Sequence, residues 1–309
     1  MIPLDIKEVV FAVDGHTEKE VSGSISGVST DSRTIEPEQL FIPLVGENFD
    51  GHDFIKQALD KGAAFVLCDI NKRDRLSTFD RVIFVKDTQK ALMKLALYYR
   101  NLFDIPFIAV TGSVGKTTTK NMIAKVMETK FRVLKTKGNY NNEIGLPLTL
   151  FNLDKSHQIG VVEMGMSGFG EIRRMVNIVK PQVAVITNIG ISHIEKLGSK
   201  ENIAKAKMEI LEPLKPDDLA VLNADSEELW ERRNGLPTRS IFFGIKRGQL
   251  RAENVKSLGE DGVAFEVIYE KKKFSLHLSL PGTHNVYNAL AAIAVGMEYG
   301  ISLENIADA

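Results

Sequence analysis

The sequence predicts an α/β protein of two domains: a small mixed α/β domain over residues 1–98, and a larger domain over residues 99–309 with a mostly parallel sheet and an antiparallel β extension. Three observations lead to this fold class. The chain has 309 residues, 44% of them hydrophobic, which suffices for about two domains with ample cores. From residue 107 onward, short apolar runs alternate with helical patterns, as in parallel sheets covered by helices. The first of these runs enters a glycine turn that opens a helix, which is typical of a phosphate-binding loop.

The first domain is predicted from short strands and helices in mixed order. Apolar β-branched runs indicate the strands, and a 3.6-residue period indicates the helices. The predicted strands cover residues 25–31, 40–44, 65–68 and 82–85, and the predicted helices cover residues 53–61 and 88–102. Pro106 follows the second helix, so the domain boundary is expected near residues 98–106.

The second domain is predicted from a repeated strand and helix period. Strands are expected at residues 107–111, 131–135, 159–163, 182–187, 219–223 and 240–243, and helices at 116–129, 143–152, 169–179, 199–213 and 226–233. Antiparallel strands at 249–256, 261–270 and 273–280, with Lys271 to Lys273 as a solvated hairpin tip, then precede a helix at 284–300. The final residues, SLENIADA, indicate a helix that is cut off, which suggests a truncated chain or a lost C-terminal domain.

Composition and charge argue against several classes of protein. The formal net charge of −1 gives no global electrostatic reason to bind nucleic acid or an anionic membrane. No apolar run approaches the ~18 residues of a membrane span, and the N-terminus lacks a basic segment followed by a long apolar core. The single cysteine, Cys68, cannot form an internal disulfide and is expected to be a buried structural thiol. We therefore expect a protein of the reducing cytoplasm.

The segment FIAVTGSVGKTTTK, residues 107–120, makes the most specific chemical prediction. Backbone N–H groups of the turn and of the helix N-terminus would point at an anion. Lys116 would reach the β- and γ-phosphates, and the Thr117 hydroxyl would face Mg²⁺. Two residues, where four are usual, separate Gly112 from Gly115, so an ordinary strand-turn-helix remains the alternative on this pattern alone.

Polar side chains follow two later strands at the edge where open α/β sheets bind ligands. Glu163 ends a wholly apolar strand, where its carboxylate would hold a Mg²⁺ that bridges the phosphates. The alternative for Glu163 is a strand-end carboxylate paired with a basic residue. The next strand leads to His193, for which contact with metal or phosphate and a structural role are both open.

Several other polar segments indicate solvated structure on pattern alone. They are the helical face with Lys205, Lys207 and Glu209, the clusters at residues 29–33 (STDSR) and 46–54 (GENFDGHDF), and the Asn-rich loop at 138–147 (GNYNNEIGLP). Residues 71–74 match the NKxD motif with which a GTPase reads guanine, but they precede the phosphate loop, whereas a GTPase carries the motif after it. We predict a polar surface turn there.

With these pieces in order, the sequence resembles the Mur ligases, the ATP-dependent amide-forming enzymes of peptidoglycan precursor synthesis. The resemblance covers essentially the whole chain and rests on TGSVGKTTTK, GNYNNEIGLP, EMGMSGFGEI, TNIGISHIEKLGS, AKAKMEIL and GTHNVYNALAA. Within the family, NYNNEIGLP and EMGMSGFGEI are most similar to the member that adds D-alanyl-D-alanine to UDP-N-acetylmuramoyl-tripeptide. The short phosphate loop is the form expected in this family.

The resemblance implies a role for each matched residue. The residues implied to bind ATP are Gly112, Ser113, Val114, Gly115, Lys116, Thr117 and Thr118, with Asn285 and Asn288 at the adenine, helped by Asn141 or Asn142. The residues implied to bind Mg²⁺ are Thr117 and Glu163, and, for a second ion, His193 and Lys207. Lys207 matches a lysine that is carbamylated in relatives. The residues implied to bind the UDP part of the substrate, in the domain 1–98, are Ser29, Thr30, Asp31, Ser32, Arg33, Asn48, Asp50 and His52.

The implied reaction has two steps, with Lys116, Glu163, His193 and Lys207 as the catalytic set. The terminal carboxylate of the substrate attacks the γ-phosphorus of ATP to give an acyl phosphate, and the amine of D-alanyl-D-alanine then displaces phosphate. The family's C-terminal domain has no match in this sequence, so we expect a chain that binds nucleotide and UDP-substrate but ligates poorly. We also expect a monomer. The alternatives are the diamino-acid-adding Mur enzyme, a folylpolyglutamate synthase, a non-ligating ATP-binding protein, and a kinase or switch NTPase.

Overall fold

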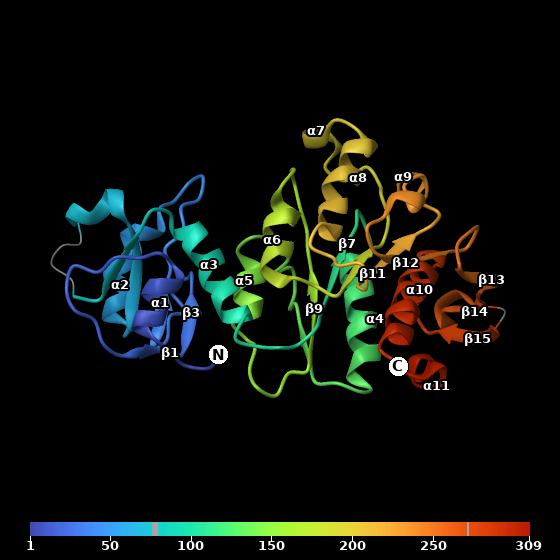
Figure 1. The fold of residues 1–309 in the computed structure, drawn as a ribbon, viewed down its shortest axis with the longest axis horizontal. Coiled ribbons are helices and arrows are strands. Elements are labelled where there is room, and N and C mark those ends of the chain that lie inside the picture. The colour runs from blue at the N-terminus through green and yellow to red at the C-terminus, as the bar shows by residue number, and fades with distance from the viewer. Residues whose placement is uncertain (76–79, 271) are drawn as a thin grey trace. The chain divides into compact units, whose positions relative to one another are not determined.

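The computed structural model describes residues 1–75, 80–270 and 272–309, which form two compact units. Unit 1 comprises Met1–Asp104 and Glu143–Lys155, and unit 2 comprises Ile105–Asn142 and Ser156–Ala309 (Figure 1). The sequence analysis divided the chain at residues 98 and 99 and assigned 143–152 to the second domain. The units differ from that division because the segment Glu143–Lys155, with a short helix at Gly145–Leu150, packs within unit 1.

Unit 1 is built on a parallel sheet of four strands in the order β3-β4-β5-β6. The strands are β3 (Gly27–Ser29), β4 (Gln39–Phe41), β5 (Phe65–Asp69) and β6 (Val82–Val85), and a separate antiparallel pair joins β1 (Leu4–Asp5) to β2 (Ser24–Ile25). The helices are α1 (Ile6–Ala12), η1 (Gly51–Phe54), α2 (Ile55–Asp60), η2 (Ile70–Arg75), α3 (Thr88–Arg100) and α5 (Gly145–Leu150), where η marks a 3₁₀ helix. The β5 and β6 strands are almost wholly buried, as their continuous apolar runs predict.

Tyr99 of α3 explains why the later segment Glu143–Lys155 belongs to unit 1. Its ring is fully buried and meets Phe103 and Phe151 edge to face at centroid distances of 5.2 and 5.8 Å. Its hydroxyl donates to the Leu153 carbonyl at 2.7 Å and accepts the N–H of Ile2, also at 2.7 Å. The α5 helix therefore covers the apolar face of α3, an arrangement that strand and helix order did not reveal.

Unit 2 is built on a nine-stranded sheet in the order β15-β14-β13-β12-β11-β10-β7-β9-β8. The strands are β7 (Phe107–Thr111), β8 (Val133–Lys135), β9 (Ile159–Glu163), β10 (Val183–Ile186), β11 (Leu219–Asn223), β12 (Arg239–Gly244), β13 (Leu250–Ser257), β14 (Val263–Tyr269) and β15 (Lys272–Leu278). The pairs from β8 to β13 are parallel, and β14 and β15 add antiparallel neighbours. The predicted fold class is confirmed.

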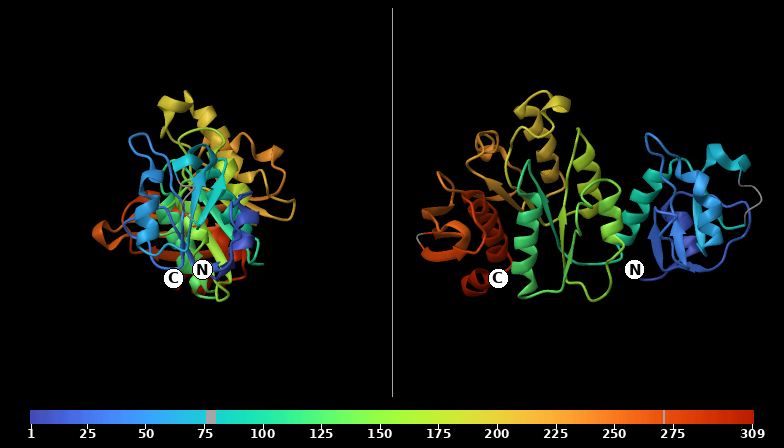
Figure 2. Two further views of the ribbon diagram at one scale, coloured as in Figure 1. Left: turned by 90° about the vertical axis from the view of Figure 1, so that its left-hand side faces the viewer. Right: turned by 180° about the vertical axis from the view of Figure 1, so that it is seen from behind.

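The helices of unit 2 are α4 (Lys116–Glu128), α6 (Glu171–Val179), α7 (Ile194–Leu197), α8 (Lys200–Met208), η3 (Glu209–Leu211), α9 (Glu227–Trp230), η4 (Arg233–Gly235), η5 (Gly259–Asp261), α10 (Thr283–Glu298) and α11 (Leu303–Asp308). The α4 and α10 helices pack against each other and against the sheet, and they lie side by side in Figure 1 and in the right-hand view of Figure 2. In the described part of the chain, no helix has the length and apolarity that crossing a membrane requires.

Most differences from the predicted elements lie at segment ends. The helix predicted at 199–213 is divided into α8 and η3, and the predicted helix 53–61 begins as the 3₁₀ helix η1. Residues 71–74 belong to the 3₁₀ helix η2, where a surface turn was predicted, and α1 and α7 were not predicted. Of the predicted hairpin tip, Lys271 lies outside the described residues, whereas Lys272 and Lys273 begin β15.

Candidate active site

The loop between β7 and α4 depends on two glycines. Gly112 has φ +153°, and a Cβ atom there would lie 1.9 Å from the Thr187 hydroxyl oxygen. Gly115 precedes α4 in the left-handed region, at φ +80°, and a Cβ atom there would lie 2.7 Å from Oδ1 of Asn288. Neighbouring side chains thus occupy the space that any other residue would need, which explains the glycine spacing in the sequence.

The residues after β10 hold this loop in place. The Thr187 hydroxyl donates to the Val114 carbonyl at 2.6 Å, and Asn188 Nδ2 donates to the same oxygen at 3.0 Å. The Val114 N–H donates to Asn188 Oδ1 at 3.1 Å, and the Ser113 hydroxyl accepts the N–H of Gly190 at 2.8 Å. The loop is therefore preorganised between two neighbouring parallel strands, at their carboxyl ends.

Two lysine amines meet at one carbonyl oxygen of this loop. Both Lys116 Nζ and Lys207 Nζ donate to the Gly112 oxygen, each at 3.0 Å. Burial lowers the pKa of Lys116. Burial and the charge of Lys116 together lower the pKa of Lys207 to about 7. Two weakly solvated amines at a phosphate-type loop favour a polyanionic ligand, because its negative charge would stabilise their protonated forms.

The solvated helical face predicted on pattern alone is wrong at two of its three residues. Lys207 is 1% exposed and Glu209 is 3% exposed, whereas Lys205 is exposed and pairs with Glu201 one turn away. Glu209 accepts the N–H groups of Gly170 and Arg173, at 2.8 and 3.0 Å, at the start of α6. Its carboxylate thus caps that helix, where negative charge is favourable.

Glu163 ends β9 directly beside the phosphate-loop strand, since its pairing partner is Val110 of β7. Its side chain is buried, and Oε1 accepts Asn141 Nδ2 at 2.8 Å. Among the described residues, its Oε2 is one of two buried side-chain oxygens without a hydrogen-bond partner. The structure therefore places no basic side chain on this oxygen, and a buried carboxylate oxygen in that state suits a cation.

His193 and Thr117 were both predicted at the edge where the parallel strands end, near the proposed metal site. His193 precedes α7 with φ +67° and is exposed, and partial burial with the charges of Lys207 and Lys116 lowers its pKa. The neutral imidazole is the form that binds metals. Thr117 is exposed in the first turn of α4, followed by Thr118.

Residues of this kind fit Mg²⁺ in part. Within residues 1–75, 80–270 and 272–309, no three His, Cys, Asp or Glu side chains converge as a metal-binding group. Mg²⁺ is usually held by one or two carboxylates together with water and phosphate oxygens, so Glu163 with a hydroxyl such as that of Thr117 is a suitable partial ligand set.

Asn285 and Asn288 of α10 lie behind the phosphate loop. Both are buried, and Asn288 accepts the Thr119 hydroxyl at 3.0 Å while its Nδ2 donates to Asn285 Oδ1 at 3.0 Å. Asn285 Nδ2 donates to the Pro281 carbonyl at 2.8 Å. These contacts brace α4 against α10. Of the loop asparagines, Asn141 reaches Glu163, and Asn142 is exposed.

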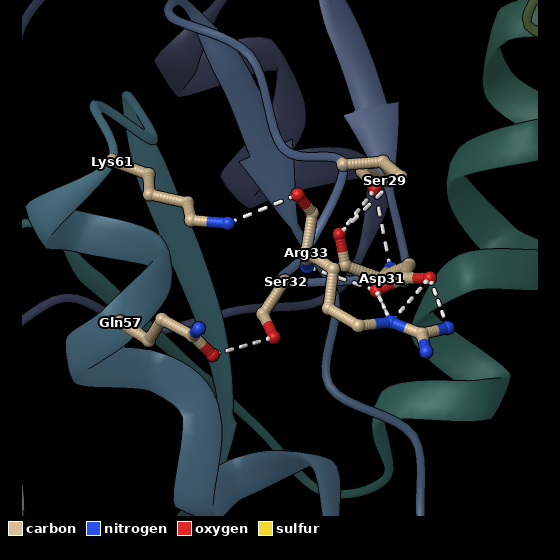
Figure 3. A network of polar contacts seen from close by, with 7 residues as sticks. Ser29, Asp31, Ser32, Arg33, Gln57 and Lys61 are labelled. Atoms are coloured by element: carbon tan, nitrogen blue, oxygen red, sulfur yellow. Dashed lines mark hydrogen bonds and ion pairs between the residues drawn. The ribbon is translucent and has the colours of Figure 1, made fainter.

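In unit 1, the STDSR segment after β3 forms a turn closed by its own side chains (Figure 3). Asp31 accepts the Arg33 N–H at 2.9 Å and the Arg33 guanidinium at 2.8 to 3.2 Å. These bonds lower the pKa of Asp31 to about 2. Ser29 bonds the backbone of Asp31, and the buried Ser32 hydroxyl donates to Gln57 at 3.0 Å, whereas Thr30 is half-buried.

The GENFDGHDF segment starts at the same sheet edge, because β4 pairs in parallel with β3. It folds back at residues 44–51 as a tight hairpin whose exposed tip carries Asn48. His52 is 8% exposed, and both of its ring nitrogens are used: Nδ1 lies 2.6 Å from Asp50 Oδ1, and Nε2 accepts the Asp69 N–H at 3.1 Å. Lys72 of η2 pairs with the other oxygen of Asp50.

Sequence reasoning missed three residues that support these sites. Lys72 lies in the segment predicted as a surface turn, yet it anchors Asp50. Lys120 and Thr136 are buried beside Glu163, and neither was singled out. One signal pointed to Lys120, because it follows Lys116 by one helical turn and therefore lies on the same face of α4.

Two family models match the chain. One, described as the Mur ligase middle domain, matches residues 110–296, and the other, described as the Mur ligase family, catalytic domain, matches residues 24–100. The first match contains the phosphate loop, Glu163, His193 and Lys207, and the second contains STDSR and the hairpin at 44–51. Together they cover the motifs on which the sequence resemblance rested.

Individual relatives agree with these matches. The chain is 44% identical to the UDP-N-acetylmuramoyl-tripeptide–D-alanyl-D-alanine ligase of Bacillus subtilis over 283 residues, which are 92% of this chain and 61% of that protein. A crystal structure of MurF from Acinetobacter baumannii superposes with a TM-score of 0.91 at 32% identity, over 99% of this chain and 67% of that one. MurF from Thermotoga maritima in complex with ADP gives a TM-score of 0.83 at 31% identity, over 91% of this chain and 65% of that one.

The chain spans about three fifths of the length of the Bacillus relative. The predicted resemblance is confirmed, both for the family and for the likeness to its D-alanyl-D-alanine-adding member. From the fold, the site and these matches together, we conclude that the chain belongs to the Mur ligase family.

Proposed function

We propose that this chain carries the UDP-substrate-binding and ATP-binding parts of a ligase that adds D-alanyl-D-alanine to UDP-N-acetylmuramoyl-tripeptide, forming ADP, in peptidoglycan precursor synthesis. The observation that carries the proposal is the preformed phosphate loop at which Lys116 and Lys207 converge, next to the strand that ends at Glu163. The D-alanyl-D-alanine-adding ligase of Bacillus subtilis matches 92% of the chain, and the MurF structure from Acinetobacter baumannii matches 99% of it.

In this proposal the loop from Gly112 to Thr118 holds the phosphates of ATP. Backbone N–H groups at the start of α4 point toward the anion, and the Lys116 amine leaves the Gly112 carbonyl to contact the β- and γ-phosphates. The adenine lies toward the start of α10, near Asn285 and Asn288, with Asn141 or Asn142 nearby. Because Asn285 and Asn288 already bond their neighbours, their main effect is to hold α10 against the start of α4.

We propose that Glu163 and Thr117 hold one Mg²⁺, and that His193 and Lys207 hold a second. When bound, the metal supplies positive charge that offsets the negative charge of the transferring phosphoryl group. Lys207 takes part as a carbamate, formed when its neutral amine attacks CO₂ and releases a proton. The carbamate nitrogen keeps one N–H, which retains a donor for the Gly112 carbonyl.

The reaction then proceeds in two displacements. A carboxylate oxygen of the tripeptide forms a bond to the γ-phosphorus while the bond from that phosphorus to the bridging oxygen of ADP breaks. Lys116 stays on the phosphoryl oxygens and offsets the charge that develops there. The amine of D-alanyl-D-alanine next attacks the acyl carbon, loses a proton, and expels inorganic phosphate.

The UDP end of the substrate is proposed to bind at the carboxyl edge of the unit 1 sheet. Thr30, Arg33 and Asn48 offer accessible polar groups there, with Ser29, Asp31 and Ser32 shaping the turn. Asp50 and His52 hold the base of the hairpin through their bonds to Lys72 and Asp69. Each unit thus receives one ligand at the sheet edge favoured in α/β proteins.

Calorimetric titration of the 309-residue chain tests this proposal. Binding is the appropriate readout because the chain spans about three fifths of the Bacillus relative. We expect UDP-N-acetylmuramoyl-tripeptide to bind, its shorter precursors to bind more weakly, and ADP to bind in a Mg²⁺-dependent way that Lys116→Met weakens. Preference for a shorter precursor or for a folate would favour the diamino-acid-adding enzyme or a folylpolyglutamate synthase instead.

A further inference from the structure

Lys120 is a buried cation to which the proposed reaction assigns no part. It lies on α4, one turn after Lys116, and is 2% exposed. Its Nζ donates to the Thr136 carbonyl at 2.8 Å. Burial lowers its pKa, and the negative charge of Glu163 opposes that shift. Burying an ammonium group costs free energy, so a buried lysine is expected to stabilise a neighbouring group that the protein needs.

Thr136 connects this lysine to Glu163. It is 1% exposed and follows β8. Its hydroxyl accepts the backbone N–H of Glu163 at 3.0 Å, while its carbonyl accepts the Lys120 amine. The Lys120 ammonium therefore holds Thr136 in place, and Thr136 in turn holds the backbone of Glu163. From the other side, Asn141 holds Oε1 and leaves Oε2 as the buried oxygen without a partner.

The burial of Lys120 is not a general feature of the lysines on α4. Lys125, on the same helix, is exposed to solvent, as lysines usually are. The charge of Glu163 acts on both Lys116 and Lys120 of α4, but their amines have different partners. Lys116 donates to the Gly112 carbonyl of the loop, whereas the buried Lys120 donates to the Thr136 carbonyl. The contacts from Lys120 through Thr136 end on the backbone N–H of Glu163, and Asn141 bonds its carboxylate. Contacts outside the ligand shell of this general kind orient metal ligands in proteins.

We propose that Lys120 is a positioning residue for Glu163, acting through Thr136 to aim the free carboxylate oxygen at a divalent cation. The inference rests on the proposed role of Glu163 as a Mg²⁺ ligand. It adds two residues to the site, Lys120 and Thr136, neither of which contacts the nucleotide or the metal in this scheme.

The test measures ADP affinity by calorimetry as a function of Mg²⁺ concentration, and again in the presence of a chelator. Lys120→Met removes the ammonium and keeps the length of the side chain, and Lys125→Met is the matched control on the same helix. Thr136→Val removes the hydroxyl that accepts the Glu163 N–H, and Thr136→Ser restores it. Thermal unfolding is recorded for every variant.

We expect Lys120→Met and Thr136→Val each to raise the half-saturating Mg²⁺ concentration by about 10-fold, the low end for partners of metal ligands. The chelator-measured ADP affinity should change by less than about 2-fold, and Lys125→Met and Thr136→Ser should resemble the wild type. The double variant should be no worse than either single variant, because the two residues act along one chain of contacts.

Other outcomes distinguish the proposed metal role of Glu163 from the positioning role of Lys120. If wild-type ADP affinity did not depend on Mg²⁺, the proposed metal role of Glu163 would fail, and this inference with it. A Mg²⁺-dependent wild type with an unchanged Lys120→Met would overturn only the positioning role. An equal loss with Mg²⁺ and with chelator would likewise overturn it, since a merely structural lysine predicts that pattern. If Lys120→Met does not fold, the comparison of Thr136→Val with Thr136→Ser tests the positioning role instead.

Discussion

Several polar groups of the candidate site are buried with fewer partners than they can bind, and a ligand would supply the missing interactions. Two amines share the Gly112 carbonyl, and the buried carboxylate of Glu163 keeps one oxygen without a hydrogen bond. Buried charges and unsatisfied oxygens cost stability in a protein without ligands, and they are retained where function needs them. At this scale, the strongest signal is the Lys207 amine, because its pKa of about 7 lies well below that of an exposed lysine.

The first prediction concerns that amine. Carbamate formation needs the neutral amine, so a pKa of about 7 makes Lys207 reactive toward CO₂ near neutral pH. With ¹³C-bicarbonate at pH 8, we expect a carbamate carbon resonance that fades as the pH falls below about 7. Lys207→Met should lack this resonance and Lys205→Met, two residues earlier on the exposed face, should keep it. A resonance that survives in Lys207→Met would refute the assignment.

The second prediction concerns Asp31 and Arg33. The folded-state pKa of Asp31, about 2, is lower than its ordinary value of 3.8, so this carboxylate contributes stability above pH 3.8 that is lost as the pH falls through about 2. Arg33→Met removes the guanidinium but keeps the backbone N–H that also bonds Asp31.

We therefore expect Arg33→Met to raise the pKa of Asp31 part of the way toward 3.8, as measured by carboxyl ¹³C NMR. Stability should also fall earlier on acidification. Arg73→Met, which removes a guanidinium paired with Glu18, is the control and should leave Asp31 unchanged. An unshifted Asp31 in Arg33→Met would mean that the backbone bond alone sets its pKa.

At the scale of elements, the turn before α4 is the best-defined feature of the site. Its two glycines fit against side chains from β10 and α10, so three segments far apart in the sequence determine one loop. The loop is suited to an anion because its bonds to Thr187 and Asn188 fix its backbone before a ligand arrives.

The third prediction tests that fit. Gly115→Ala places a Cβ atom 2.7 Å from Asn288 Oδ1 and imposes a left-handed φ of +80° on alanine. We expect it to lower the free energy of unfolding by about 1–3 kcal/mol and to weaken ADP binding. Gly235→Ala is the control, since no heavy atom lies within 4 Å of its Cβ position, and it should change stability by less than about 0.5 kcal/mol. Equal effects of the two substitutions would contradict a role for the close approach.

The elements that were predictable from the sequence are those with a continuous local signal. The β7, β9 and β11 strands have the predicted bounds because each is a short apolar run between polar turns. The burial of Lys207 and Glu209 was not predictable, because their positions read as polar on a helical period and only the packing of α8 and η3 against the loop and α6 buries them. The sequence pattern shows that a residue is polar, but only tertiary contacts determine whether it is buried or exposed.

The same distinction applies to the candidate site. Motif spacing brought Gly112, Lys116 and Glu163 to one sheet edge, and the structure agrees. Their supports, Lys120 and Thr136, are joined by a carbonyl and a backbone N–H, which carry no sequence signature. His52 shows the reverse case, since the family resemblance implied a ligand contact, yet both ring nitrogens already have partners within unit 1.

At the scale of the whole molecule, the chain folds into two compact units. Each unit has its own sheet, parallel in unit 1 and mostly parallel in unit 2, and its own apolar core. The chain passes between them three times, at residues 104–105, 142–143 and 155–156. The segment 143–155, which includes α5, therefore leaves unit 2 immediately after Asn141 and Asn142. A loop that supports Glu163 thus continues directly into the unit proposed to bind the UDP end of the substrate.

The last prediction assigns one ligand to each unit. A ligand that binds the folded state stabilises the segments that contact it, and amide hydrogen exchange reports this locally. We expect ADP with Mg²⁺ to slow exchange at residues 112–120 and 200–208, in unit 2. We expect UDP-N-acetylmuramoyl-tripeptide to slow exchange at 29–33 and 44–54, in unit 1. Protection by the UDP-substrate confined to unit 2 would refute the assignment, because the unit 1 edge would then have no ligand. Slowed exchange at 143–155 with ADP and Mg²⁺ would show, in addition, that a ligand of unit 2 affects this segment of unit 1.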